Sequence, residues 1–297
     1  MAIQNVMAAL LLATALAGCP MSSDEQPSPS SDLTRVSSVK TAMAKNGTPS
    51  AGPPVKTLSA PAPFAALEVP GHAAAVVSLP LGATSPRPVV VATHGNYDKP
   101  EWTCDMWRSV VENRGFVICP RGIASPNSPP GDPRHRYASN AALEREIHAS
   151  LDALRASYSD FVAAGPVVYA GFSQGAIMGA PIISRNPSLF TRAVLIEGGY
   201  DRMSPAVVRS FAKGGGERVL FACGQGLCER LANESARALG KLGVEAQVVH
   251  GVGEGHSYFG KVADEVRRSF DWVVGLDARW LDPSARGGHP DGVAASP

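Results

Sequence analysis

The sequence has no excess of charge of either sign, no basic block, and no N-terminal hydrophobic run long enough to span a membrane. Its 27 Lys and Arg residues nearly balance 26 Asp and Glu residues, which gives a formal net charge of +1. A nucleic-acid partner is therefore not expected, because the basic surface it needs is missing. The apolar run at residues 6–16 is too short to cross a bilayer as a helix. These absences argue against a DNA- or RNA-binding protein and against an N-terminal membrane span.

The N-terminal apolar run ends in Leu16, Ala17, Gly18 and Cys19. This ending resembles the lipobox of bacterial lipoproteins, although residues 1–5 lack the Lys or Arg that usually precedes such a run. The resemblance implies that residues 1–18 are a signal peptide and that Cys19 carries the lipid that anchors the protein to a membrane of the bacterial cell envelope. The same resemblance implies an outer-membrane or periplasm-facing position, because Pro20 rather than Asp follows the cysteine. The alternative interpretation is a buried N-terminal helix.

Residues 20–63 are rich in Ser, Pro, Thr, Ala and Gly and hold few large apolar side chains. Such a segment cannot bury enough surface to offset the entropy lost on ordering. We therefore predict that residues 19–63 form a disordered tether after the lipidated cysteine, and that residues 281–297 form a flexible tail. Residues 64–280 remain as a single domain, long enough to bury a sizeable core.

The four other cysteines are an even number, which suits disulfides in an exported protein. Of the three possible pairings we favour Cys104 with Cys119 and Cys223 with Cys228, the second of which closes a very short loop. A zinc site is the alternative, but no matching Cys or His pair accompanies the spacing of Cys223 and Cys228. No metal or cofactor is expected.

Within residues 64–280, short β-branched runs alternate with longer amphipathic patterns. Leu143, Ile147, Leu151 and Leu154 recur at helical spacing, for example. This alternation is typical of an α/β sheet with helices on both faces. We expect strands at residues 73–79, 88–93, 116–119, 166–170, 193–196, 218–222 and 246–250, and helices at 102–113, 143–158, 174–185, 229–242 and 259–273.

Residues 120–140 differ from the rest of the domain because they contain five prolines and the cluster Arg134, His135 and Arg136. We predict an irregular loop at the rim of the site. Because loops on a rigid sheet often carry specificity, it could help to choose a substrate. The alternative is a solvated surface loop without a role.

The pattern Gly171-Phe172-Ser173-Gln174-Gly175 stands between a predicted strand and a predicted helix. In this context the two glycines allow backbone segments to approach closely, and the turn exposes the serine hydroxyl. The helix N-terminus also favours negative charge that develops in acyl transfer. Ser173 is therefore the candidate nucleophile. The alternative is a tight turn with an inert serine.

A serine hydroxyl needs a neighbouring base to become a good nucleophile. His256 lies just after the last predicted strand and just before the last predicted helix. His250 ends that strand and is expected to be structural, while His148 and His72 are poorly placed. His256 is therefore the candidate base.

The chain order of the candidate nucleophile Ser173 before the candidate base His256 resembles that of the α/β-hydrolase superfamily of serine esterases, lipases and thioesterases. The resemblance covers nearly all of residues 64–280. It implies the α/β-hydrolase fold, with a mostly parallel central sheet and helices on both faces. It also implies an oxyanion hole formed by the amide of Gln174 and by one amide of the turn that begins at Thr93. We assign the second amide to Asn96, with Gly95 as the alternative, and expect His94 to shape the turn.

The acid departs from the family pattern, because residues 223–229 contain no Asp where such proteins usually have one. Glu229 is the first carboxylate there, and a disulfide could fix its position. Glu197, at the end of an earlier strand, is an equal rival, with Asp201 behind both. The acid normally holds the histidine tautomer and stabilises the imidazolium, so an enzyme without one would be slow.

These residues predict a hydrolase of carboxylic esters that acts through an acyl-enzyme on Ser173, with a small-molecule or polymer ester as substrate. Thioesters, peptides and lactones remain open, because the fold hosts many reactions. The competing hypothesis is a surface-anchored binding lipoprotein that keeps the fold but has little or no activity. The missing Asp is the feature that favours it.

Overall fold

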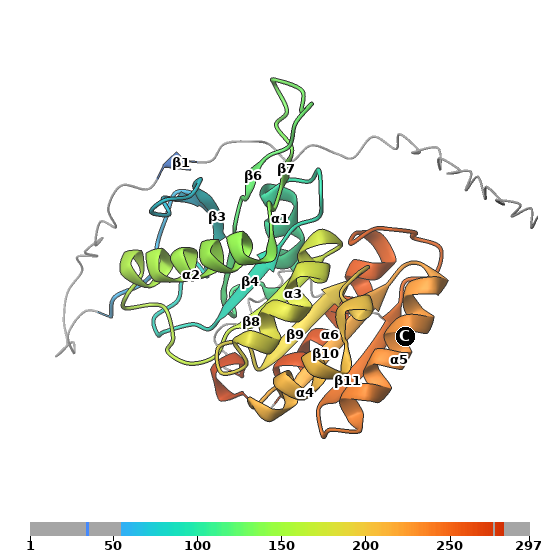
Figure 1. Cartoon of the computed structure of the whole chain (residues 1–297). Helices are drawn as coiled ribbons and strands as arrows, with labels where there is room; N and C mark the ends of the chain where they lie inside the picture. The colour runs from blue at the N-terminus through green and yellow to red at the C-terminus, as the bar shows by residue number, and fades with distance from the viewer. Residues whose placement is uncertain (1–33, 36–54, 276, 282–297) are drawn as a thin grey trace, which may run out of the picture. The chain divides into compact units, whose positions relative to one another are not determined.

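The computed structural model describes residues 34–35, 55–275 and 277–281 (Figure 1). The predicted signal peptide, Cys19, and most of the predicted tether and tail lie outside the described residues. Leu58 falls inside the predicted tether, yet it is only 1% exposed and packs in the core. Among the helices of the described ranges, none combines the length and the apolar character that a bilayer crossing requires.

A nine-stranded sheet with the order β1-β2-β3-β5-β4-β8-β9-β10-β11 forms the centre of the fold. From β5 to β11 all neighbouring strands are parallel, whereas β3 runs antiparallel to β2 and β5. The strands are β1 (Thr34–Arg35), β2 (Phe64–Leu67), β3 (Ala75–Ser78), β4 (Val89–Thr93), β5 (Phe116–Cys119), β8 (Val168–Phe172), β9 (Arg192–Ile196), β10 (Arg218–Cys223) and β11 (Glu245–His250). The predicted mostly parallel sheet is therefore confirmed.

Helices cover both faces of this sheet, as predicted. Side chains of α2, α3, α4 and α5 pack into one buried cluster, and those of α1 and α6 pack into a second cluster on the opposite face (Figure 1). The helices are α1 (Pro100–Val111), α2 (Asn140–Ser157), α3 (Gln174–Arg185), α4 (Pro205–Lys213), α5 (Gly226–Gly240) and α6 (Gly260–Val274), with short 3₁₀ turns η1 (Tyr200–Arg202) and η2 (Ala278–Trp280).

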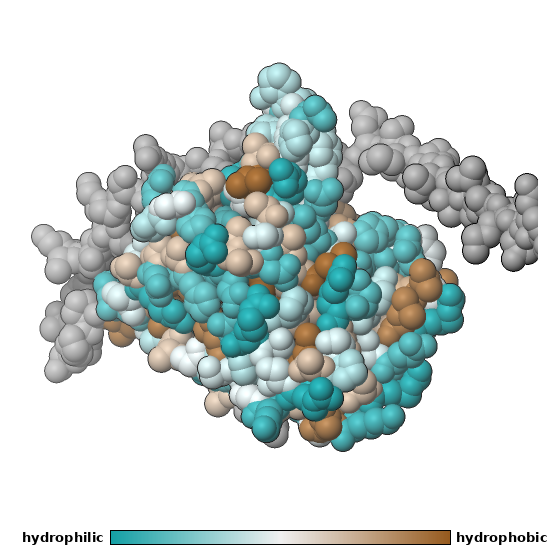
Figure 2. Space-filling view, viewed as in Figure 1, coloured by the Kyte–Doolittle hydropathy of each residue, from teal (hydrophilic) through white to brown (hydrophobic). Residues whose placement is uncertain are grey.

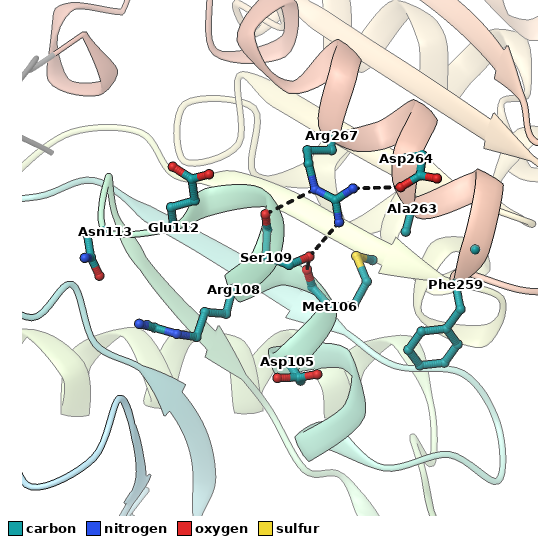
Figure 3. Close-up of a pocket in the computed structure, with 11 residues that line it drawn as sticks. Asp105, Met106, Arg108, Ser109, Glu112, Asn113, Phe259, Ala263, Asp264 and Arg267 are labelled. Atoms are coloured by element: carbon teal, nitrogen blue, oxygen red, sulfur yellow. Dashed lines mark hydrogen bonds and ion pairs between the residues drawn. The ribbon is translucent and has the colours of Figure 1, made fainter. Parts of the chain in front are cut away.

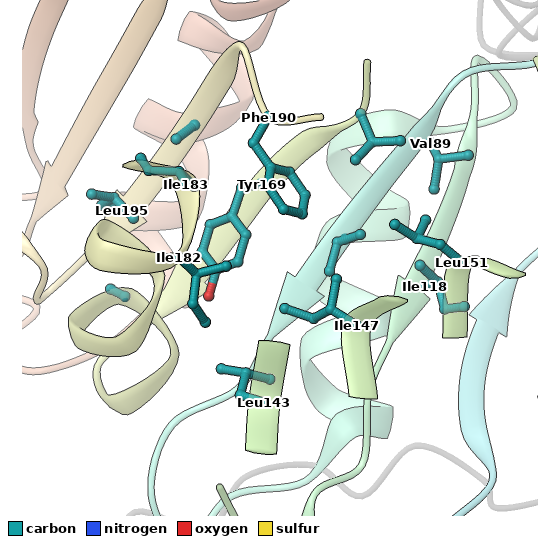
Figure 4. Packing of buried hydrophobic residues seen from close by; sticks show 14 of the residues in the cluster. Val89, Ile118, Leu143, Ile147, Leu151, Tyr169, Ile182, Ile183, Phe190 and Leu195 are labelled. Carbon is teal, nitrogen blue, oxygen red and sulfur yellow. The ribbon is translucent and has the colours of Figure 1, made fainter. Parts of the chain in front are cut away.

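Figure 4 shows how the first cluster is built beneath α2 and α3. Ile147 and Leu151 of α2 meet Ile118 of β5, while Tyr169 of β8 and Phe190 stack edge to face at 5.5 Å between ring centroids. All five side chains are 0–1% exposed. Burial of this kind contributes about 1.5–3 kcal/mol for each large side chain, so it fixes the strands that carry the loops above them.

The predicted elements differ from the observed ones mainly where the apolar signal is weak. Strand 116–119 and helix 174–185 have the predicted bounds, whereas β8 continues to Phe172, so that Ser173 follows the strand directly. Sequence analysis missed β2 and α4. The reason for α4 is that only Val208 and Phe211 of its nine residues are buried, which leaves too few apolar positions to reveal a period.

The prediction of a wholly irregular loop at residues 120–140 was wrong in part. It contains a hairpin of β6 (Ile123–Ala124) and β7 (His135–Arg136), which projects beyond the sheet at the top of Figure 1. Burial lowers the pKa of His135 to about 4, so this imidazole is uncharged near neutral pH. Just before β7, Arg134 lies over the Trp102 ring at 4.3 Å and Asp132 pairs with Lys99. The hairpin is therefore fixed against the start of α1.

The surface seen in Figure 2 is mostly hydrophilic, with hydrophobic residues scattered in small groups. On the α1 and α6 face, Figure 3 shows the residues that line an open groove with a volume of about 600 Å³. Arg267 crosses this groove and donates to the carbonyl oxygen of Ser109 at 3.3 Å and to its hydroxyl at 3.1 Å. These bonds tie α6 to α1.

Candidate active site

Polar segments follow the carboxyl ends of several neighbouring parallel strands. Because parallel strands end at the same edge of a sheet, these segments meet there. They are the turn at residues 94–97 after β4, Ser173 after β8, Glu197 after β9, the connection at 224–225 after β10 and the loop at 251–259 after β11. We call the first the oxyanion turn and the last the histidine loop.

Ser173 stands on a sharp turn between β8 and α3, with a backbone φ of +48°. Its amide donates to Ile196 of the neighbouring strand at 2.9 Å. A Cβ atom on Gly175 would lie 2.5 Å from the carbonyl oxygen of Thr93, and one on Gly171 would lie 2.7 Å from the amide nitrogen of Ala176. Both glycines of the pattern are thus required by close backbone approach.

Ser173, His256 and Glu197 form one continuous chain of hydrogen bonds. The Nε2 atom of His256 lies 2.8 Å from the Oγ atom of Ser173, and its Nδ1 atom lies 3.1 Å from Oε2 of Glu197. The His256 side chain is 47% exposed, whereas that of Glu197 is fully buried. The candidate nucleophile, base and orienting acid are therefore in hydrogen-bond contact, with the candidate base open to solvent.

Glu197 is held from the side opposite His256 by two backbone amides. Its Oε1 atom accepts from Gly224 at 2.5 Å and from Gln225 at 2.9 Å. Its own backbone has a φ of +50°. Bonds from amides stabilise an ionised carboxylate, so Glu197 is suited to orient His256 and to stabilise its charge.

Glu229, the other equally weighted acid, does not approach His256. It lies in the first turn of α5, and its Oε2 atom pairs with Nδ1 of His250 at 2.8 Å. Asp201 pairs with the neighbouring Arg202 at 3.2 Å. Helix α5 starts at Gly226, inside the disulfide loop, and carries Glu229 toward the surface. Glu197 instead follows β9, the immediate neighbour of β8. The sequence signal that could have favoured Glu197 over Glu229 was the run Glu197-Gly198-Gly199 directly after a buried strand.

The two disulfides join the predicted pairs, Cys104 with Cys119 and Cys223 with Cys228. The second encloses Gly224 and Gln225, whose amides bind Glu197. The Cys223 and Cys228 sulfurs and a Glu197 oxygen lie within 4.8 Å of one another, but the sulfurs are bonded to each other and are not free thiolate ligands. The short disulfide thus fixes Glu197 rather than the expected Glu229.

The two candidate amides of the oxyanion turn differ in whether they already donate a hydrogen bond. The Gly95 amide donates to Oδ2 of Asp98 at 3.1 Å and is therefore occupied. Within the described part of the chain, the amides of Asn96 and Gln174 have no hydrogen-bond acceptor. These are the two amides that the sequence assigned to an oxyanion hole, and both remain available to a ligand.

His94 has the structural role expected of it. It is fully buried, its Nε2 atom lies 2.9 Å from the carbonyl oxygen of Arg121, and its ring stacks on Tyr137 at 4.4 Å. The Tyr137 hydroxyl accepts from the His94 amide at 3.1 Å. The Gln174 side chain in turn binds both backbone groups of Tyr137, at 2.8 and 3.2 Å. Sequence analysis missed Tyr137, because a lone tyrosine in a proline-rich segment carries no periodic signal.

Removal of the short disulfide is expected to reduce activity more than stability. The double variant Cys223→Ser/Cys228→Ser frees the loop whose amides hold Glu197, so kcat should fall by roughly 10- to 100-fold, in line with the effect of lost outer contacts on a positioned group. In the chain-entropy model, so short a loop contributes only about 2 kcal/mol. Steady-state kinetics and thermal unfolding measure the two effects.

The matched control is Cys104→Ser/Cys119→Ser, which opens a loop with a sequence separation of 15 at the opposite side of the sheet. It should cost about 3 kcal/mol of stability and leave kcat near the wild-type value. Equal losses of kcat in the two double variants would contradict a specific role for the short disulfide.

Comparison with solved structures gives the α/β-hydrolase fold. Est1E from Butyrivibrio proteoclasticus is similar with a TM-score of 0.51 at 13% identity, over 72% of this chain and 99% of that one. Poly(aspartic acid) hydrolase-1 from Sphingomonas sp. KT-1 gives 0.50 at 13%, over 70% and 98%. An uncharacterized protein from Bacillus cereus gives 0.52 at 13%, over 64% of this chain and 60% of that one.

No family model and no curated protein matches the sequence. The similarity therefore extends to the fold, and the chemistry has to be argued from the residues of this chain.

Proposed function

We propose that this protein is a serine hydrolase that cleaves carboxylic esters through an acyl-enzyme on Ser173. The observation that carries the proposal is the chain of hydrogen bonds from Ser173 through His256 to Glu197, at 2.8 and 3.1 Å. Its order and geometry match what activation of a serine hydroxyl requires.

In the first step, Oγ of Ser173 attacks the ester carbonyl carbon while Nε2 of His256 accepts the hydroxyl proton. The carbonyl oxygen becomes an oxyanion, and the amides of Gln174 and Asn96 donate to it. His256 then returns the proton to the alkoxy oxygen as the bond from carbon to that oxygen breaks. The alcohol leaves and the acyl group stays on Ser173.

In the second step, water takes the place of the alcohol. His256 removes a proton from the water as its oxygen attacks the acyl carbon, and then returns this proton to Ser173 Oγ as the acid is released. Glu197 keeps the proton of neutral His256 on Nδ1 and stabilises the imidazolium in both steps. The net reaction consumes one ester and one water.

The alternative of a binding lipoprotein without activity depended on a missing triad acid. The contact of Glu197 with His256 removes that argument. The name of the Sphingomonas protein also describes a hydrolase, which is compatible with the proposal.

A panel of nitrophenyl esters of increasing acyl length tests the reaction. We expect turnover with a burst of about one equivalent of nitrophenol for each active site, because an acyl-enzyme accumulates when its hydrolysis is slower. A fluorophosphonate probe should label the wild-type protein. A folded protein that shows neither turnover nor labelling would contradict the proposal.

We further propose that lipid on Cys19 anchors the hydrolase to the cell envelope. The lipobox-like motif at residues 16–19 supports this, because it ends in a cysteine whose thiol can carry a lipid. In a bacterial host, Cys19→Ser should abolish palmitate incorporation and shift the protein from the detergent phase to the aqueous phase. Its kcat on a soluble ester should stay unchanged. Detergent partitioning that is the same in both proteins would contradict the anchor.

A further inference from the structure

Asp98 directly follows the oxyanion turn, and its side chain is buried. Three donors converge on its carboxylate: the Gly95 amide at 3.1 Å on Oδ2, and the Lys99 amide at 2.7 Å and the Tyr258 hydroxyl at 3.2 Å on Oδ1. The Lys99 ammonium pairs with Asp132 instead. Because a buried carboxylate needs hydrogen bonds from its surroundings, these three donors fix both its orientation and their own positions.

Tyr258 connects this carboxylate to the base, because it lies two residues after His256 in the histidine loop. It is 3% exposed, and its ring packs on Phe172 with 4.4 Å between centroids. Phe172 also contacts the His256 ring, at 5.2 Å. Burial, together with the charge of Asp98, raises the pKa of Tyr258 well above its ordinary value, so the phenol stays protonated and donates.

We propose that Asp98 is a positioning residue that sets the distance between the oxyanion turn and the histidine loop. On the turn it binds the Gly95 amide, which leaves the next amide, that of Asn96, available to a substrate. On the loop it binds Tyr258, which fixes the backbone close to His256. This inference rests on the proposed function.

The arrangement matters because the oxyanion donors and the base act on the same substrate group. The Asn96 amide and the base come from loops after β4 and β11, which are separated by three strands in the sheet order. The Asp98–Tyr258 bond joins them directly across the site. A misplacement of about 1 Å between catalytic groups can cost on the order of 10²-fold in rate.

Two variants cut the connection at different points. Tyr258→Phe removes the bond to Asp98 and keeps the Gly95 bond, so kcat should fall by about 10-fold. In Asp98→Asn an NH₂ group replaces one of the two acceptor oxygens, so it faces the N–H group of Gly95 or Lys99 and cannot accept from it. The turn therefore also shifts, and kcat should fall by about 100-fold. KM should change little, and the double variant should be no slower than Asp98→Asn alone, because both act through one connection. Each kcat is expressed per active site titrated by the nitrophenol burst.

Matched controls separate positioning from stability. Asp277→Asn removes a carboxylate that pairs with Arg279, and Tyr158→Phe changes a buried tyrosine that contacts Phe116. Both should lower Tm or leave it unchanged while kcat per titrated site stays at the wild-type value. If the Asp98 and Tyr258 variants behave in the same way, they are structural and the proposal is overturned. If Asp98→Asn does not fold, Tyr258→Phe still decides. Absence of both burst and labelling in wild-type protein overturns the proposed function, and this inference with it.

Discussion

Ser173→Ala is expected to lower kcat for a nitrophenyl ester by on the order of 10⁶-fold, as removal of the nucleophile does in other serine hydrolases. KM should change little, because the hydroxyl reacts with the substrate rather than holding it. The residual rate would come from the amides of Gln174 and Asn96 and from His256 acting on water. Steady-state kinetics with active-site titration measures this loss, and the fluorophosphonate label should disappear.

The control for this variant is Ser184→Ala, at the far end of the same helix α3. Its hydroxyl donates to the Pro181 carbonyl oxygen at 2.9 Å and has no part in the proposed chemistry. It should keep wild-type kcat and labelling. Retention of more than about a tenth of the activity in Ser173→Ala would show that another group is the nucleophile.

Glu197→Gln should lower kcat by about 10⁴-fold, the scale observed when an orienting acid becomes an amide. The Gly224 and Gln225 amides both bind Oε1, so the glutamine oxygen is expected to take that position. Its NH₂ group then faces Nδ1 of His256 and donates to it. This places the imidazole proton on Nε2, where it blocks acceptance of the Ser173 proton.

Glu229→Gln is the matched control, because Glu229 was an equal candidate on sequence grounds but pairs with His250. Its kcat should stay within about twofold of wild type, since a half-exposed pair contributes little. The reverse pattern, with a large loss in Glu229→Gln and a small loss in Glu197→Gln, would identify Glu229 as the acid.

The strand ends of the site could be predicted from the sequence, whereas the contacts between loops could not. Ser173 was recognised because it follows a buried strand with a strong apolar signal and precedes a helix. His256 was recognised because it lies between the last predicted strand and the last predicted helix. The elbow glycines added a second signal, since only glycine fits where the Cβ clashes arise. The disulfide pairs were favoured from spacing alone, and the structure contains both.

The acid remained ambiguous because chain order does not reveal which strand ends are neighbours. Glu197 and Glu229 both follow buried strands, and only the adjacency of β8 and β9 separates them. Asp98, Tyr137 and Tyr258 were missed for a related reason. The bonds of Tyr137 to His94 and Gln174 and the bond between Asp98 and Tyr258 join residues 37 to 160 positions apart in the sequence. No local pattern encodes such a contact.

The positive φ angles of Ser173 and Glu197 imply a trade-off between stability and activity. Such backbone conformations cost on the order of 1–3 kcal/mol each for a residue other than glycine. A search for thermostable variants would therefore favour glycine at position 173, and it would lose the nucleophile by doing so. Improved stability in this protein should instead come from positions away from the carboxyl edge of the sheet, where replacement leaves the reacting groups in place.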